Sequence, residues 1–285
     1  MKTTTPSRSI VVVFSVLAAL FWPVRFVAAS EDLEREFGDI VLLQPPSRSW
    51  VQLTSDTEYI YTSNPLLLPD SGLFPAQEDG LFYESLGLRF TPPALGNLSS
   101  ALYFSQDFVR YAENTQYDFD VQSAGVQLRY PIEDWFALYG GGSAERLTLC
   151  GSGREFFKMY DAQLGLWRTQ QLGEHAAVFG GYQFDWRPST PGAYTRFDNT
   201  PFAGVTATLL PRLTAQCQYR FSVRDYSRLD RHDCNHIVTL SLTYTFNPYI
   251  ALSASTSYSR NDSSLATRDY ELFEGGGGLK LSVKF

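Results

Sequence analysis

Two consecutive stretches near the C-terminus decide the fold: residues 235–246, NHIVTLSLTYTF, and residues 249–260, YIALSASTSYSR. In each stretch every second position is mainly apolar, and the positions between are mainly threonine or serine. Successive side chains of a β-strand point to opposite faces, so a period of two predicts a strand with one apolar and one polar face. Asn247-Pro248 lies between the stretches and predicts a tight turn.

The same alternation recurs from Trp50 to the C-terminus, and we expect about twelve strands. They are residues 50–62, 80–91, 98–111, 119–130, 134–147, 156–170, 174–187, 199–210, 212–225, 235–246, 249–261 and 271–285. The first two strands have the weakest alternation. If that pair does not form, the count falls to ten.

The connections between these strands alternate in length. The short ones are Thr91–Asn97, Pro131–Glu133, Gln171–Gly173, Pro211 and Asn247-Pro248. The longer ones are polar and run about Ser63–Glu78, Ala112–Asp118, Thr148–Glu155, Arg187–Asp198, Asp225–Cys234 and Asn261–Asp269. Short turns at one end and long loops at the other are typical of outer-membrane barrels, whose short turns lie in the periplasm. A soluble β-sandwich, the alternative, gives no reason for this segregation.

We therefore expect an all-β protein in which residues 50–285 form a transmembrane antiparallel up-and-down β-barrel in a Gram-negative outer membrane. No later apolar segment is long enough to span a bilayer as a helix. An even strand count returns the C-terminus to the periplasm, beside the N-terminus of the barrel.

The first residues predict an export signal. Lys2 and Arg8 precede a twelve-residue apolar run, residues 10–21, which suits a signal peptide and is too short to span a bilayer. Val27-Ala28-Ala29 favours cleavage after residue 29; an uncleaved anchor is the alternative. Residues 30–49 are polar and then proline-rich, and we expect a periplasmic N-terminal segment.

Composition and charge narrow the class of partner. The chain has 17 Tyr, 21 Phe and 5 Trp, residues that favour strands and gather at membrane interfaces. Tyr130 with Trp135, and Phe246 with Tyr249, flank short turns, which predicts an aromatic girdle there. The net charge of −7 supplies no positive footprint for nucleic acid. The surrounding partner is expected to be outer-membrane lipid.

In a membrane barrel the apolar set of positions meets lipid and the polar set lines the lumen. The expected lumen-lining charges are Arg89, Arg129, Arg220, Arg224 and Lys280 against Asp56, Glu58, Asp107, Asp161 and Asp185. In an open channel such groups tune ion selectivity, and in a closed barrel they pair across the interior. A twelve-strand interior is wider than the eight-strand interior that side chains fill, which favours a narrow pore.

The sequence indicates no catalytic, metal or cofactor site. The contexts of His175, His232 and His236 do not match the His-x-Ser-Asn-Gly motif of the twelve-stranded phospholipase A. Residues 232–236 form a polar loop entering a strand in this interpretation, because structural metal sites usually need four converging ligands. Cys150 and Cys234 both fall in expected outer loops, which leaves open a disulfide between them.

The C-terminus resembles a known signature. Leu279, Leu281, Val283 and Phe285 alternate with polar residues, and this resembles the terminal strand of outer-membrane barrels, which the barrel assembly machinery reads in those families. Residues 258–264 (YSRNDSS), Asp269-Tyr270 and the glycine-rich last strand are similar to the end of the uncharacterised families named "putative β-barrel porin". The resemblance implies location, fold and assembly partner, and hardly any chemistry.

Three functions stay open in this order: a porin-like channel for passive diffusion of small solutes, a structural or surface-interaction barrel without conductance, and a lipid-modifying enzyme. The sequence names neither a solute nor an oligomeric state.

Overall fold

The structure is a computed structural model that describes residues 27–28, 34–35, 50–65, 67, 78–132 and 136–285. Almost all of the expected signal peptide and most of residues 30–49 lie outside the described residues. The two-residue strands β1 (Val27–Ala28) and β2 (Glu34–Arg35) pair with each other and not with the main sheet.

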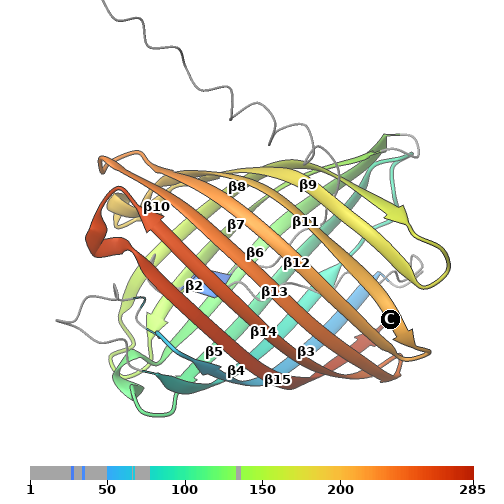
Figure 1. Ribbon diagram of the computed structural model, residues 1–285, viewed down its shortest axis with the longest axis horizontal. Coiled ribbons are helices and arrows are strands. Elements are labelled where there is room, and N and C mark those ends of the chain that lie inside the picture. Colours follow the sequence, from blue (N-terminus) through green and yellow to red (C-terminus); the bar gives the residue numbers. More distant parts are fainter. Residues whose placement is uncertain (1–26, 29–33, 36–49, 66, 68–77, 133–135) are drawn as a thin grey trace, which may run out of the picture.

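Twelve antiparallel strands form one closed barrel (Figure 1). They are β3 (Val51–Thr62), β4 (Asp79–Phe90), β5 (Ser99–Tyr111), β6 (Phe119–Ile132), β7 (Phe136–Leu149), β8 (Glu155–Gln171), β9 (Ala176–Arg187), β11 (Arg196–Leu210), β12 (Leu213–Tyr226), β13 (Arg231–Asn247), β14 (Ile250–Ser263) and β15 (Tyr270–Lys284). Each strand pairs with its neighbours in the chain, and β15 pairs with β3 to close the ring. The short strand β10 (Ser189–Thr190) extends the sheet beside β8.

The expectation of an all-β barrel of about twelve strands is confirmed, and the ten-strand alternative is wrong. Strands β3 and β4 pair without a break from Val51 with Phe90 to Thr62 with Asp79. The largest differences lie at the starts of β11 and β13, which begin at Arg196 and Arg231, so the loops expected at Arg187–Asp198 and Asp225–Cys234 are shorter than predicted. Both strands begin with charged side chains that are buried on the inner face. Charged residues are typical of exposed loops, so the sequence pattern indicated a loop at these positions.

The two ends of the barrel differ in their connections. At the short-turn end, which also holds Trp50 and Phe285, the described turns are residues 91–98, 172–175, 211–212 and 248–249, and β6 and β7 are joined at this end by three residues. At the long-loop end the connections are residues 63–78, 112–118, 150–154, 188–195, 227–230 and 264–269, with 3-10 turns η1 (Thr115–Tyr117), η2 (Gly192–Tyr194) and η3 (Ala266–Arg268). Among the described residues no helix has the length and apolar character needed to cross a membrane.

The outer face of the barrel is an apolar belt. Leu164 and Leu240 are 61% and 48% exposed at mid-strand, whereas a water-soluble protein would bury such residues. Tyr130, Phe246 and Tyr249 are exposed near the short-turn end, and Tyr182, Phe184 and Trp186 near the long-loop end. Two aromatic girdles therefore border the belt, as in outer-membrane barrels. Trp135, which was expected in one girdle, lies outside the described residues.

The seam between the first and last strands is tightly packed. Phe285 donates its backbone N–H to Val51 O at 2.9 Å, and Gln52 Nε2 donates to Ser282 Oγ at 3.0 Å across 230 residues of sequence. A Cβ added at Gly278 would lie 2.2 Å from Thr57 O, so only glycine fits beside that backbone. The glycine run in β15 thus permits the close approach of the two strands that closes the ring.

We expect Gly278→Ala to impair closure, because the added methyl group collides with the backbone of β3. Gly275→Ala is the matched control in the same run, since its Cβ would meet nothing nearer than 3.8 Å. The fraction of refolded protein that keeps a compact, heat-sensitive mobility on an electrophoretic gel measures closure. Equal fractions for the two variants would contradict this role of Gly278.

Candidate functional site

The candidate functional site is the inner wall of the barrel. All ten charged residues expected in the lumen occupy inward positions of their strands. Asp185 is fully buried while its neighbours Phe184 and Trp186 are exposed, and Arg220 is 6% exposed beside Tyr219 at 38%. The inward positions of the strands thus bring these side chains to one face of the wall.

An arginine–aspartate network lies on β8, β9 and β11 in the half of the barrel next to the long loops. Arg187 places Nη1 3.3 Å from Asp198 Oδ2 and Nε 3.7 Å from Asp161 Oδ1. Arg196 Nε lies 3.0 Å from Asp198 Oδ1. All four side chains are nearly buried, so each charge depends on its partners for stabilisation.

Asp185 and Asp107, also in the long-loop half, are held by uncharged donors. Tyr139 donates its hydroxyl to Gln183 Oε1 at 2.9 Å, and Gln183 Nε2 donates to Asp185 Oδ1 at 2.7 Å. Ser85 and Ser105 donate hydroxyl hydrogen bonds to Asp107. These chains link β7 with β9 and β4 with β5 on the inner face.

A second charged group lies on β12 and β13. The Arg231 guanidinium binds both oxygens of Asp233, with Nε 2.9 Å from Oδ1, and stacks on Tyr226 at 4.4 Å. Arg224 Nη2 donates to Asn235 Oδ1 at 3.4 Å. A small cavity borders this group and is lined by Arg224, Asn235, Ile237, Ser257, Ser259, Tyr270, Leu272 and Glu274.

The sequence analysis missed Arg187, Arg196, Asp198, Arg231 and Asp233, because it assigned them to loops or to loop edges. A signal was present: Arg196, Asp198 and Thr200 continue the inward set of β11, and Arg231 and Asp233 continue that of β13. Extending each alternating pattern until it breaks would have included them.

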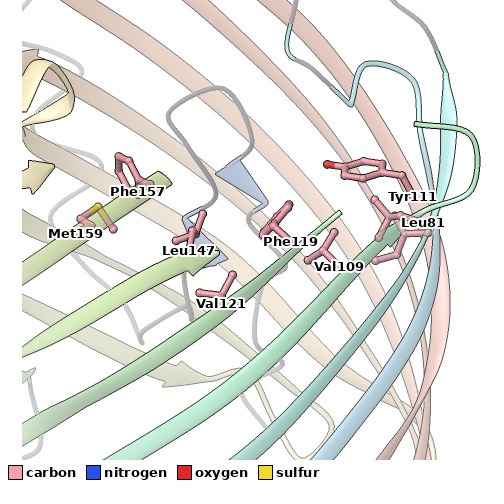
Figure 2. Packing of buried hydrophobic residues seen from close by; sticks show 9 residues of the cluster. Leu81, Val109, Tyr111, Phe119, Val121, Leu147, Phe157 and Met159 are labelled. Carbon is pink, nitrogen blue, oxygen red and sulfur yellow. The ribbon is translucent and has the colours of Figure 1, made fainter. Parts of the chain in front are cut away.

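Apolar side chains line the same half of the barrel on β3 to β8 (Figure 2). The cluster consists of Ile60, Leu81, Val109, Tyr111, Phe119, Val121, Leu147, Phe157 and Met159, all at most 4% exposed. Tyr194 of η2 packs on Phe157 with ring centroids 5.8 Å apart. The interior next to the long loops is therefore part apolar and part ionic, which the expectation of a polar inner face did not include.

The half next to the short turns is lined differently. Lys280 Nζ lies 2.8 Å from Asp56 Oδ2, with side chains 40% and 18% exposed. Arg89 Nη1 donates to Gln127 Oε1 at 3.0 Å. Arg129 lies over the ring of Trp167 at 4.6 Å. Basic side chains thus point into the lumen in this half, and they are less buried than the arginine–aspartate network next to the long loops.

The cysteines do not form the disulfide left open between Cys150 and Cys234. All three cysteines are free. Four strands separate β7 from β13 along the wall, and at about 4.8 Å per strand this exceeds the roughly 7 Å between Cα atoms that a disulfide spans. Burial and the carboxylate of Asp120, to which Cys150 Sγ donates at 3.3 Å, raise the pKa of the Cys150 thiol to about 11.

The histidines are dispersed. His175 lies in the turn after β8, while His232 and His236 lie in β13 and not in a loop. His232 pairs with Asp225 and its side chain is 66% exposed; His236 Nδ1 lies 2.8 Å from the Tyr219 hydroxyl on the outer face. Within the described part of the chain, no three His, Cys, Asp or Glu side chains are grouped to hold a metal ion.

Comparisons with known proteins agree with this architecture. A model of the family described as "Putative beta-barrel porin 2" matches residues 188–282, a region that contains the last strands of the barrel. No curated protein sequence matches the chain. The similarity to porin families, expected from the last forty residues, is confirmed.

Solved structures of outer-membrane proteins are similar to this chain at low sequence identity. An outer membrane channel from Pseudomonas putida F1 is 11% identical, with 86% of this chain and 99% of that one covered and a TM-score of 0.56. The outer membrane channel DcaP of Acinetobacter baumannii is 11% identical, covering 82% and 96%, with a TM-score of 0.47. LpxR from Salmonella typhimurium is also 11% identical, covering 79% and 99%, with a TM-score of 0.45.

Arg187→Ala is expected to destabilise the barrel, because it leaves the buried carboxylates of Asp161 and Asp198 without this cation. Breaking such a buried pair costs about 3–5 kcal/mol. Arg146→Ala removes a salt bridge to Glu155 whose arginine is 51% exposed, and should cost less than about 1 kcal/mol. Urea titration of the free energy of unfolding in lipid vesicles measures both. Equal losses would show that the network does not support the wall.

Proposed function

Since the chain is an outer-membrane β-barrel similar to the family "Putative beta-barrel porin 2", we propose that it is a porin-like channel for passive diffusion of small solutes. The observation that carries the proposal is the charged inner wall of a twelve-strand barrel. A barrel with no aqueous path requires every inner ion to be paired and buried, because moving ions out of water costs several kcal/mol each, whereas the inward Lys280 is 40% exposed. Hydrated charges along a lumen instead select what passes.

Because the two halves of the lumen are lined by different side chains, the proposed path has a narrow region and a wider region. The buried networks next to the long loops form the narrow region, where solute size is limited. The half next to the short turns has smaller and more exposed inward side chains, among them Gln52, Ser253 and Ser255. It forms a wider vestibule.

A structural barrel without conductance is the second candidate. The dense packing of Ile60, Leu81, Phe119 and Leu147 favours it, because such a cluster occupies lumen space. The enzyme alternative has less support: the exposed His232 and the outward-facing His236 lie on the lipid side of β13, outside the lumen.

For orientation, we propose that the short-turn end faces the periplasm and the long loops face outside, so that both ends of the barrel chain lie in the periplasm. The length difference between the two sets of connections supports it. The outward row of Leu281, Val283 and Phe285 at the end of β15 fits the expected assembly signal, because all three side chains are exposed to a binding partner.

Purified protein in planar lipid bilayers should conduct ions in discrete steps. Ser253→Trp adds a large ring to the vestibule and should lower the unit conductance. Ala254→Trp, one residue away on the outer face, should leave the conductance unchanged. Absence of any conductance in the unmodified protein would overturn the channel and favour the structural barrel.

Thiol labelling tests the orientation. In a chain with its three cysteines replaced by serine, Leu229→Cys in the loop after β12 should react with a membrane-impermeant maleimide on intact cells. Arg212→Cys in the turn after β11 should react only after lysis. The reverse pattern would invert the barrel.

A further inference from the structure

The inward charges of the short-turn half are mostly basic. Arg89 is the second-last residue of β4, Arg129 lies near the end of β6, and Lys280 and Lys284 fall in the last five residues of β15. All four therefore lie near the short turns. The acids at this level are Asp56, which Lys280 contacts at 2.8 Å, and the half-buried Glu58, the next inward residue of β3.

The rest of this half is neutral among the described strands. The inward positions opposite the basic residues carry hydroxyl, amide or apolar side chains, among them Phe179, Thr206, Gln216, Thr239, Ser241 and Ser253. No acid on that wall compensates for the basic residues. Two acids, Asp56 and Glu58, against four bases leave a net charge of +2 on the inner strand faces.

The basic residues form an arc and not a scattered set. Lys284 pairs in the ladder with Gln52, Gln52 with Arg89, and Arg89 with Tyr103. Arg89 reaches across β5 to Gln127, and Arg129 continues the arc to Trp167 on β8. These contacts orient the guanidinium groups along half of the circumference.

The acids of the other half do not reverse this charge. Asp161 and Asp198 are neutralised by buried arginines, Asp233 by Arg231, and Asp107 is bound by two hydroxyl donors. The other inward acids of this half are at most 8% exposed: Asp79, Glu145, Asp185 and Glu274. Buried, paired ions act weakly on a passing solute, whereas half-exposed ones act directly through water. A guanidinium also matches the two oxygens of a carboxylate.

Resting on the proposed channel function, we infer that the short-turn half of the lumen is an anion filter, in which Arg89, Arg129 and Lys280 favour small anions, carboxylates in particular. The arc supplies the positive field, and the neutral opposite wall leaves it uncompensated.

Reversal potentials in potassium chloride and potassium acetate gradients test this filter. The unmodified channel should be more permeable to chloride and to acetate than to potassium. The triple variant Arg89→Gln, Arg129→Gln, Lys280→Gln removes three of the four positive charges and should lower both permeability ratios to about one or below, since a filter of this kind acts through its charge. Arg89→Lys, Arg129→Lys, Lys280→Arg keeps the charge and should keep the preference.

Arg168→Gln is the matched control. Arg168 follows Trp167 in β8 and lies near Phe136, at the same depth but on the outer face, so its loss should leave the ratios unchanged. Heat-sensitive gel mobility shows that each variant is folded. A conducting channel that prefers potassium, or a triple glutamine variant with unchanged ratios, would overturn the filter alone. A folded protein without conductance would overturn the channel and the filter together.

Discussion

The structure depends on one constraint: in lipid, every backbone N–H and C=O group must find its partner within the protein. An unsatisfied group in hydrocarbon costs several kcal/mol, so a sheet can cross a membrane only if it has no edge. Here β15 bonds to β3 and β8 bonds to β9, so each of the twelve strands has two neighbours. Closure then fixes the faces, because alternate side chains must point to lipid or to the interior.

The two halves of the interior are built from different kinds of side chain. Next to the long loops, the Arg187 network and the apolar cluster around Phe119 pack like the core of a soluble protein, and they support a wide wall from within. Next to the short turns, smaller side chains and the arc of basic residues leave the wall less buried. The stabilising contacts and the proposed selectivity thus belong to different depths of the same barrel.

The sequence predicted the strands and their two faces well, because alternation and turn residues are local properties. It placed Asp56 and Glu58 on the face that also carries Ile60, but periodicity does not tell which depth of that face is apolar. It assigned Arg196, Asp198, Arg231 and Asp233 to loops, since polar residues buried as ion pairs look like solvent-exposed ones. The disulfide left open between Cys150 and Cys234 does not form, because the order of strands around the ring puts four strands between β7 and β13.

The seam between Gln52 and Ser282 has a consequence for the order of folding. Eleven of the twelve strand pairings join neighbours in the chain, so each needs only a short loop to close. The twelfth pairing joins residues 230 positions apart, so forming it carries the entropic cost of closing a loop that contains nearly the whole barrel sequence. The seam is therefore the last part of the wall to form, and the first strand keeps one unpaired edge until the final strand arrives.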